Sequence, residues 1–255
     1  PRFDSFIVVC EVSKAYKSYR FTRLSVYEFM AFVNRQNLDF GPIQPEQWTF
    51  SRNIVKRLLE MPCDFWSVSS MRIIDLPADD ADAIQQAATL LVEAFKVHAP
   101  NAWPDLDAAL EEVREALEPE KVCRAALDVQ GEVLGWIGAI PQYETTAWEL
   151  HPLVVHPAHQ GKGIGRALVA DLEEQVRARG GLTIYLGTDD EDFRTSLSQV
   201  DLYEKTWEHI ANIRNLNRHP YEFYQKMGYT IVGVLPDANG WNKPDIWMAK
   251  RVGKK

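Results

Sequence analysis

From Met71 onward the apolar positions follow two periods, and each period predicts one kind of element. Apolar residues recur every three to four positions in five stretches, which predicts helices over Asp79–Lys96, Leu106–Leu117, Ile164–Arg179, Leu202–Ile213 and Tyr221–Met227. Short β-rich runs predict strands over Ile73–Leu76, Val122–Val129, Val133–Ile140, Trp148–Val155, Leu182–Gly187, Tyr229–Val234 and Ile246–Ala249. Gln130-Gly131 separates two of these runs and predicts a hairpin. This order indicates an α/β fold with a mixed central sheet flanked by helices.

The first 70 residues do not share this pattern. They contain aromatic-rich stretches between Phe21 and Phe32 and a short amphipathic run over Ile54–Met61, but no catalytic motif. We therefore expect a small N-terminal extension, residues 1–70, and a main domain, residues 71–255. The extension can be an accessory helical module, a fused or vector-derived leader, or upstream sequence read through into the gene. The missing initiator methionine and a change of charge at Met71, itself a usable translation start, favour an appended segment.

Composition describes an ordinary globular protein, with 46% hydrophobic and 25% charged residues. No apolar run reaches the length of a membrane span, and the first residues lack the pattern of a signal peptide. The three cysteines, Cys10, Cys63 and Cys123, show no pair spacing, which is typical of free thiols in a reducing compartment. We expect a cytoplasmic protein without a metal centre.

Charge is divided unevenly along the chain. Residues 1–70 hold 9 basic and 7 acidic side chains, whereas residues 71–255 hold 19 basic and 29 acidic ones, a net charge of −10. Such a domain repels nucleic acid and anionic membranes and attracts cations. The acidity therefore fits a cationic small-molecule substrate, although solubility alone accounts for much of it.

A glycine-rich loop connects a strand to a long helix at Gln160-Gly-Lys-Gly-Ile-Gly165. Backbone N–H groups in such a loop converge on one point, and the positive end of the helix dipole adds to them, which predicts a pyrophosphate cradle. The order of the glycines differs from the dinucleotide fingerprint and from the Walker loop. It resembles the acetyl-CoA loop of the GNAT acetyltransferases, Gln/Arg-x-x-Gly-x-Gly/Ala after a strand.

A second segment, Asn217 to Tyr229, resembles the GNAT pattern Asn-x-x-Ala-x-x-Phe/Leu-Tyr-x-Lys-x-Gly-Phe/Tyr, with Pro220 in place of the alanine. The resemblance implies that Tyr224 is the general acid near the coenzyme A sulfur; a core tyrosine is the alternative. It also implies that the strand before the glycine loop, Leu150–Val155, splays from the next strand, Leu182–Leu186, to admit the pantetheine arm. The Leu153 N–H would then lie on the thioester carbonyl. The implied cofactor-binding residues are Leu153, Val154, Val155, Gln160, Gly161, Lys162, Gly163, Ile164, Gly165, Arg166, Asn217 and Tyr224.

Two titratable residues, Glu149 and His151, lie two positions apart on the strand before the loop, so their side chains share a face. Either can take a proton from a substrate ammonium, and Glu149 is the better candidate for base or ammonium anchor. A structural histidine is the alternative for His151. No cysteine lies in these motifs, which argues for direct transfer without an acetyl-cysteine intermediate.

An unusually long acidic segment follows the strand at Leu182–Gly187. Its four consecutive acidic residues, from Asp189 to Asp192, predict either an acidic rim for a polycation or a solvated turn with a helix N-cap. Aromatic and acidic residues from other segments can complete a substrate cleft with this rim. The predicted substrate-binding residues are Trp103, Tyr143, Glu144, Glu149, Asp189 and Asp190.

Several further blocks give a closer resemblance, among them Trp148-Glu-Leu-His-Pro-Leu-Val-Val155 and Asn239-Gly-Trp-Asn-Lys-Pro-Asp-Ile-Trp-Met248. They are similar to the aminoglycoside 6′-N-acetyltransferases of the enterococcal chromosomal type, from about Met71 to Arg251. The resemblance implies acetyl-CoA as cosubstrate, acetylation of the 6′-amine of the antibiotic, and a homodimer. A GNAT enzyme for another polycation, such as a polyamine or a lysine-rich peptide, and a non-catalytic acyl-CoA sensor remain as alternatives.

Overall fold

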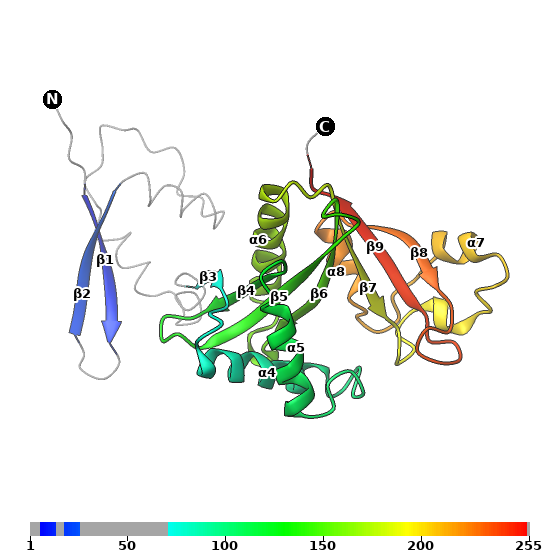
Figure 1. Cartoon of the computed structure of the whole chain (residues 1–255), viewed down its shortest axis with the longest axis horizontal. Coiled ribbons are helices and arrows are strands. Elements are labelled where there is room, and N and C mark those ends of the chain that lie inside the picture. The colour runs from blue at the N-terminus through cyan, green and yellow to red at the C-terminus, as the bar shows by residue number, and fades with distance from the viewer. Residues whose placement is uncertain (1–5, 14–17, 26–70, 254–255) are drawn as a thin grey trace, which may run out of the picture. The chain divides into compact units, whose positions relative to one another are not determined.

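The computed structural model describes residues 6–13, 18–25 and 71–253, with side chains from residue 71 onward (Figure 1). The chain divides into two compact units, Pro1–Glu60 and Met61–Lys255. In the first unit, strands β1 (Phe6–Ser13) and β2 (Ser18–Ser25) form an antiparallel pair. The amphipathic run Ile54–Met61 lies outside the described residues, so an accessory helical module stays one of the three alternatives for the extension.

The second unit is built on a seven-stranded sheet with the order β3-β4-β5-β6-β7-β9-β8. All neighbours are antiparallel except β6 and β7, so the sheet is mixed, as the sequence predicts. The strands are β3 (Arg72–Asp75), β4 (Val122–Leu127), β5 (Val133–Gln142), β6 (Ala147–Val155), β7 (Thr183–Asp189), β8 (Thr230–Leu235) and β9 (Asp245–Arg251).

Helices cover both faces of this sheet (Figure 1). In β4, Val122 and Ala126 belong to one buried cluster and Ala125 to another, and alternate residues of a strand point to opposite faces. The first cluster contains residues of α6 (Ile164–Ala178) and α8 (Tyr221–Lys226), and the second contains residues of α4 (Ala81–Phe95) and α5 (Leu106–Ala116). The two faces of the sheet are therefore called the α6 side and the α5 side.

One predicted helix is shorter than expected. The sequence predicts a helix over Leu202–Ile213, whereas α7 covers only Thr206–Ala211. Lys205 has a φ of 50°, a left-handed conformation that a right-handed helix cannot continue through. Leu202 is buried before this point and anchors the segment by its side chain instead.

A β-bulge in the β5–β6 ladder changes which residues of β6 share a face. Ile137 pairs with Leu153 but Ala139 pairs with Leu150, so the two residues between them on β6 lie opposite Gly138 alone. A Cβ at Gly138 would lie 2.4 Å from the His151 carbonyl oxygen, which explains the glycine there. Leu150 and Leu153 both contact the cluster on the α6 side, although residues three positions apart in a regular strand point to opposite faces. Glu149 and His151 therefore face the α5 side, and Leu153 faces the α6 side.

Candidate active site

The glycine-rich loop has the geometry of an anion cradle. It runs from the short 3₁₀ turn η2 (Pro157–His159) to α6, whose N-cap is Gly163. Gly161 has a φ of +76° and Gly163 a φ of +89°, conformations that favour glycine, and a Cβ at either position would meet open space. Among the described residues, the backbone N–H groups of residues 161–166 have no protein acceptor. The loop thus presents free donors at the N-terminus of a 15-residue helix.

Strands β6 and β7 separate directly after a short contact. They pair only from Ala147–Thr183 to Glu149–Tyr185, whereas β7 pairs with β9 along its whole length on the other edge. On its other edge, β6 donates the His156 N–H to the Leu134 carbonyl at 2.9 Å. Because alternate residues of an antiparallel strand bond to the same neighbour, Leu153 and Val155 turn their backbone groups away from β5, into the gap beside β7. This gap has the backbone donors and acceptors that an extended pantetheine amide can pair with.

Two of the predicted cofactor residues do not reach the gap with their side chains. Val154 pairs with Trp136 of β5 and its side chain is 2% exposed within the α4–α5 cluster, so this side chain does not line the gap and a cofactor contact at Val154 stays a prediction. Ile164 is also buried in the core, and only its backbone N–H belongs to the cradle. By contrast, Lys162 and Arg166 are exposed cations at the loop, and Gln160 caps the Val155 carbonyl with its Nε2 at 3.2 Å.

Helix α8 carries the predicted general acid. Pro220 is its N-cap, as expected for a proline at a helix start. Tyr224 is 8% exposed, packs on Phe223 and Tyr229, and burial raises the pKa of its hydroxyl, which therefore stays protonated and able to donate. Asn217 lies before the helix in an exposed loop, where its backbone binds that of Arg194. Gly165 connects this helix to the cradle, since a Cβ there would touch Phe223.

On the α5 side of the sheet, Glu149 has a hydrogen-bond donor beside it. The Tyr185 hydroxyl donates to Glu149 Oε2 at 3.2 Å, from the strand position paired with Glu149. Burial and then the charge of Glu149 raise the pKa of Tyr185 to about 12. Tyr185 is therefore a fixed donor that orients the Glu149 carboxylate, and the sequence interpretation missed it because the pairing of β6 with β7 is a long-range contact.

His151 also has a partner that the sequence interpretation missed. Its Nε2 lies 3.6 Å from Glu112 Oε1 on α5, and Trp103 packs beside the imidazole with ring centroids 5.9 Å apart. A pocket of about 180 Å³ opens next to these groups. Its lining residues are Glu112, Glu115, Ala116, Lys121, Val122, Ala139, Ile140 and His151. The structure therefore brings Trp103, a predicted substrate residue, next to His151, a predicted catalytic residue.

Tyr143 and Glu144 lie in the tight turn between β5 and β6, both exposed and both with positive φ. Tyr143 is 77% exposed, so its ring is free for an external contact. The turn leads directly into the strand that carries Glu149. Both residues are accessible at this edge of the sheet.

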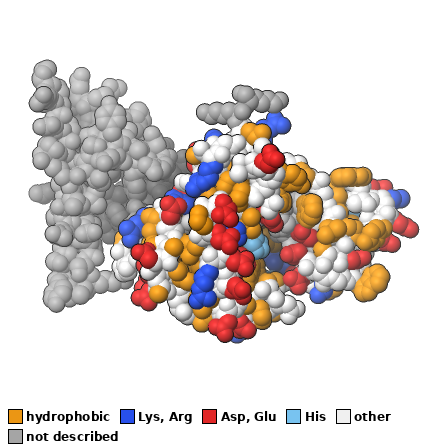
Figure 2. Space-filling view, in the orientation of Figure 1, with side chains coloured by type: hydrophobic (Ala, Val, Ile, Leu, Met, Phe, Trp, Pro, Cys, Tyr) orange, Lys and Arg blue, Asp and Glu red, His pale blue; other side chains and the backbone are white. Residues whose placement is uncertain are grey.

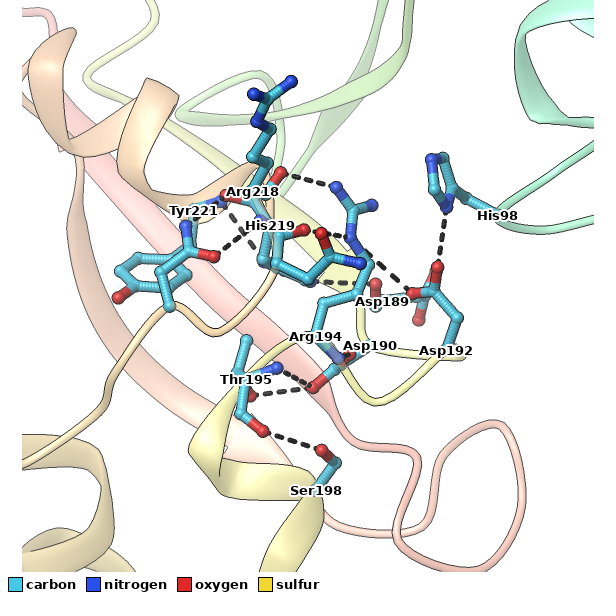
Figure 3. A network of polar contacts seen from close by, with 12 residues as sticks. His98, Asp189, Asp190, Asp192, Arg194, Thr195, Ser198, Arg218, His219 and Tyr221 are labelled. Atoms are coloured by element: carbon cyan, nitrogen blue, oxygen red, sulfur yellow. Dashed lines mark hydrogen bonds and ion pairs between the residues drawn. The ribbon is translucent and has the colours of Figure 1, made fainter.

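The acidic run after β7 is not a uniform rim (Figure 3). Asp189 is exposed and accepts the Asn239 amide at 2.5 Å, and Asp192 lies 2.6 Å from His98 Nδ1. Asp190, however, is fully buried and accepts three hydrogen bonds, from the N–H groups of Arg194 and Thr195 and from the Thr195 hydroxyl. The prediction that Asp190 binds substrate is therefore wrong, because it is an internal acceptor that folds its own loop.

A further carboxylate, Asp245, completes this side of the sheet. It is the β9 partner of Asp189, and its Oδ2 accepts the Trp247 indole N–H at 2.6 Å. Burial, followed by the charge of Asp189, raises its pKa to about 6. Glu149, Asp189 and Asp245 thus lie on one face of three adjacent strands, and Figure 2 shows further acidic side chains over the neighbouring helices. Such a face attracts ammonium groups.

Within residues 71–253 no three or more His, Cys, Asp or Glu side chains are grouped to hold a metal ion. Nor does any helix of the described chain have the length and apolar character to cross a membrane.

Comparison with known proteins identifies the class. The model of the acetyltransferase (GNAT) family matches residues 85–208. A crystal structure of an aminoglycoside 6′-N-acetyltransferase complexed with coenzyme A is 50% identical, with a TM-score of 0.67, over 72% of this chain and 98% of that one. The aminoglycoside 6′-N-acetyltransferase from Enterococcus faecium is 49% identical, with a TM-score of 0.65 and the same coverage of 72% and 98%.

Mycothiol acetyltransferase of Stackebrandtia nassauensis is 32% identical over 104 residues, which cover 40% of this chain and 34% of that protein. The chain therefore spans about a third of this curated relative. Fold, cradle and relatives together define an acyltransferase that acts on amines. The chain belongs to the GNAT acetyltransferase family and is an acetyl-CoA-dependent N-acetyltransferase.

Proposed function

We propose that this enzyme acetylates the 6′-amine of aminoglycoside antibiotics and thereby confers resistance to them. The observation that carries the proposal is the position of Glu149, which lies on an acidic sheet face immediately before the β6–β7 gap. A polyammonium substrate gains most from such a face, and the two similar structures described above are of aminoglycoside 6′-N-acetyltransferases.

The residues divide the chemical work between the two faces of the sheet. Acetyl-CoA, when bound, supplies the thioester whose acetyl group is transferred. The N–H groups of residues 161–166 hold its pyrophosphate, with Gln160, Lys162 and Arg166 at the rim of the cradle, and the pantetheine arm follows β6 at Leu153 and Val155. The Leu153 N–H binds the thioester carbonyl oxygen and stabilises its negative charge during attack.

Proton transfer needs one acceptor and one donor. Glu149, oriented by Tyr185, takes a proton from the substrate ammonium, and the neutral amine attacks the carbonyl carbon. The C–N bond forms, the C–S bond breaks, and Tyr224 gives its proton to the departing sulfur. The attacking nitrogen releases its second proton, which returns through water to the Tyr224 oxygen, so that the net reaction releases only the proton taken by Glu149. Trp103, Tyr143, Glu144 and Asp189 contact the rest of the substrate. We expect the enzyme to act in the cytoplasm as a homodimer.

The test is acetyl-CoA-dependent thiol release with two acceptor groups. Kanamycin and tobramycin carry a 6′-amine, whereas paromomycin carries a 6′-hydroxyl and is the matched control. We expect turnover with the first two and none with paromomycin. If neither group turns over while acetyl-CoA still binds, the aminoglycoside assignment is wrong, and polyamines or lysine-rich peptides become the acceptors to assay.

A further inference from the structure

A three-residue contact links the α4–α5 connection, helix α5 and strand β6. Glu112 is its centre: Oε1 lies 3.6 Å from His151 Nε2, and Oε2 accepts the Trp103 indole N–H at 3.4 Å. The ring of Trp103 lies against that of His151, and Phe95 of α4 meets Trp103 edge-on at 4.7 Å between centroids. The side chain of Glu112 is 22% exposed, so the contact is partly shielded from water.

The charges around His151 are mostly negative. Glu112 faces it from α5, Glu149 from its own strand and Asp189 from β7, while Glu115 and Lys121 line the adjacent pocket. Contact with Glu112 is the main cause that raises the pKa of His151, and contact with His151 is the main cause that lowers the pKa of Glu112. A raised pKa of His151 and a lowered pKa of Glu112 both agree with the geometry of an ion pair.

We propose that Glu112 is a positioning residue, which holds the His151 imidazole on strand β6 in its cationic form and in one orientation through an ion pair. A cationic imidazole cannot accept a proton from the substrate, so this role leaves Glu149 as the base. Glu112 also joins His151 to Trp103, so the orientation of the imidazole depends on the α4–α5 connection. The consequence for catalysis depends on the proposed function, but the charge and orientation of His151 do not.

The test is a histidine titration by NMR on the full chain, with ¹³C-labelled histidine and no substrate. The chain has six histidines, and the resonance lost in His151→Gln identifies the relevant one. We expect Glu112→Gln to move the His151 midpoint to lower pH. Glu115→Gln is the matched control, because Glu115 lies on the same helix and lines the same pocket, and it should leave the midpoint unchanged.

The proposal is overturned if the midpoint in Glu112→Gln equals that of the wild type, or if Glu115→Gln lowers it equally. Should Glu112→Gln fail to fold, Glu112→Asp keeps the charge on a shorter stem and should give a midpoint below that of the wild type. An unchanged midpoint in a folded Glu112→Asp also contradicts a specific contact.

Kinetics provide a second readout. Glu112→Gln should lower kcat about 10-fold through misplacement of His151, with the KM for acetyl-CoA unchanged and the alkaline limb of the pH profile moved to lower pH. Glu111→Gln should retain the wild-type profile, because Glu111 is an exposed carboxylate of the same helix that does not line the pocket. Because the NMR titration needs no acceptor, failure to acetylate aminoglycosides would refute the proposed function without affecting this inference.

Discussion

Replacing Asp190 by alanine should destabilise the protein strongly, although the residue lies in an acidic run that resembles a solvated turn. Its carboxylate is completely buried and accepts hydrogen bonds of 2.6, 2.9 and 2.7 Å, from the Arg194 N–H, the Thr195 N–H and the Thr195 hydroxyl (Figure 3). The loop that these bonds close also carries the Arg194 guanidinium, which donates to the carbonyl groups of Asn217 and Arg218. Asp190 therefore connects the end of β7 to the segment before α8.

The magnitude follows from the three bonds. A hydrogen bond to a charged group contributes about 1.5–3 kcal/mol, and the alanine variant leaves buried donors without acceptors. We therefore expect a loss of about 3–5 kcal/mol in the free energy of unfolding, which corresponds to a fall of about 10 °C in Tm for a domain of this size.

The assay is urea and thermal denaturation of Asp190→Ala beside Asp192→Ala. Asp192 is the matched control, because its side chain is 33% exposed and its partners are His98 at 2.6 Å and Arg194 at 3.8 Å. An exposed pair contributes about 1 kcal/mol or less. If Asp190→Ala unfolds within about 2 °C of the wild type and instead raises the KM for the acceptor, Asp190 is a substrate residue after all and the reasoning from burial fails.

Four further outcomes are expected. Tyr224→Phe should lower kcat roughly 10- to 1000-fold with little change in coenzyme A binding, and a wild-type kcat would remove Tyr224 from the mechanism. Gly163→Val should abolish coenzyme A binding in calorimetry while the fold persists, since a side chain there has open space but an unfavourable φ of +89°. Asp245→Asn should raise Tm at pH 8 but not at pH 4: a carboxyl whose pKa is raised from 3.8 to about 6 loses its contribution to stability as the pH rises through that range. Deletion of residues 1–70 should leave turnover intact, and an inactive truncation would assign the segment to the catalytic fold.

Local pattern was sufficient for most elements of the fold. The helix predicted from Ile164 is confirmed, because its apolar stripe at Leu168, Leu172 and Val176 is the one that packs on the sheet. The glycine loop could also be predicted, because its positive φ values and free N–H groups depend on neighbouring residues alone. The helix over Leu202–Ile213 was predicted too long, because the left-handed Lys205 has no signature in the apolar period.

The partners of the candidate catalytic residues could not be predicted. Glu112 meets His151 across 39 positions of sequence, and Tyr185 meets Glu149 only because β6 and β7 run parallel for three residue pairs. Asp190 shows the converse error: its charge suggested exposure, while three local donors allow it to be buried. For a carboxylate in a polar segment, the sequence does not indicate whether its oxygens accept hydrogen bonds from water or from the protein chain.

The bulge opposite Gly138 lets one strand serve both halves of the proposed reaction. In a regular strand, Glu149, His151, Leu153 and Val155 would all face the same side. The proposed base, Glu149, would then share that side with the two residues proposed to follow the pantetheine arm, Leu153 and Val155. The extra residue at His151–Pro152 turns Leu153 toward the α6 side, while Glu149 and His151 keep to the α5 side. The backbone of Leu153 still points into the β6–β7 gap, between the two faces. In the proposed mechanism, an acetyl group held there is accessible from the acidic face, while the cradle at Gly163 would hold the pyrophosphate of the cofactor on the other face.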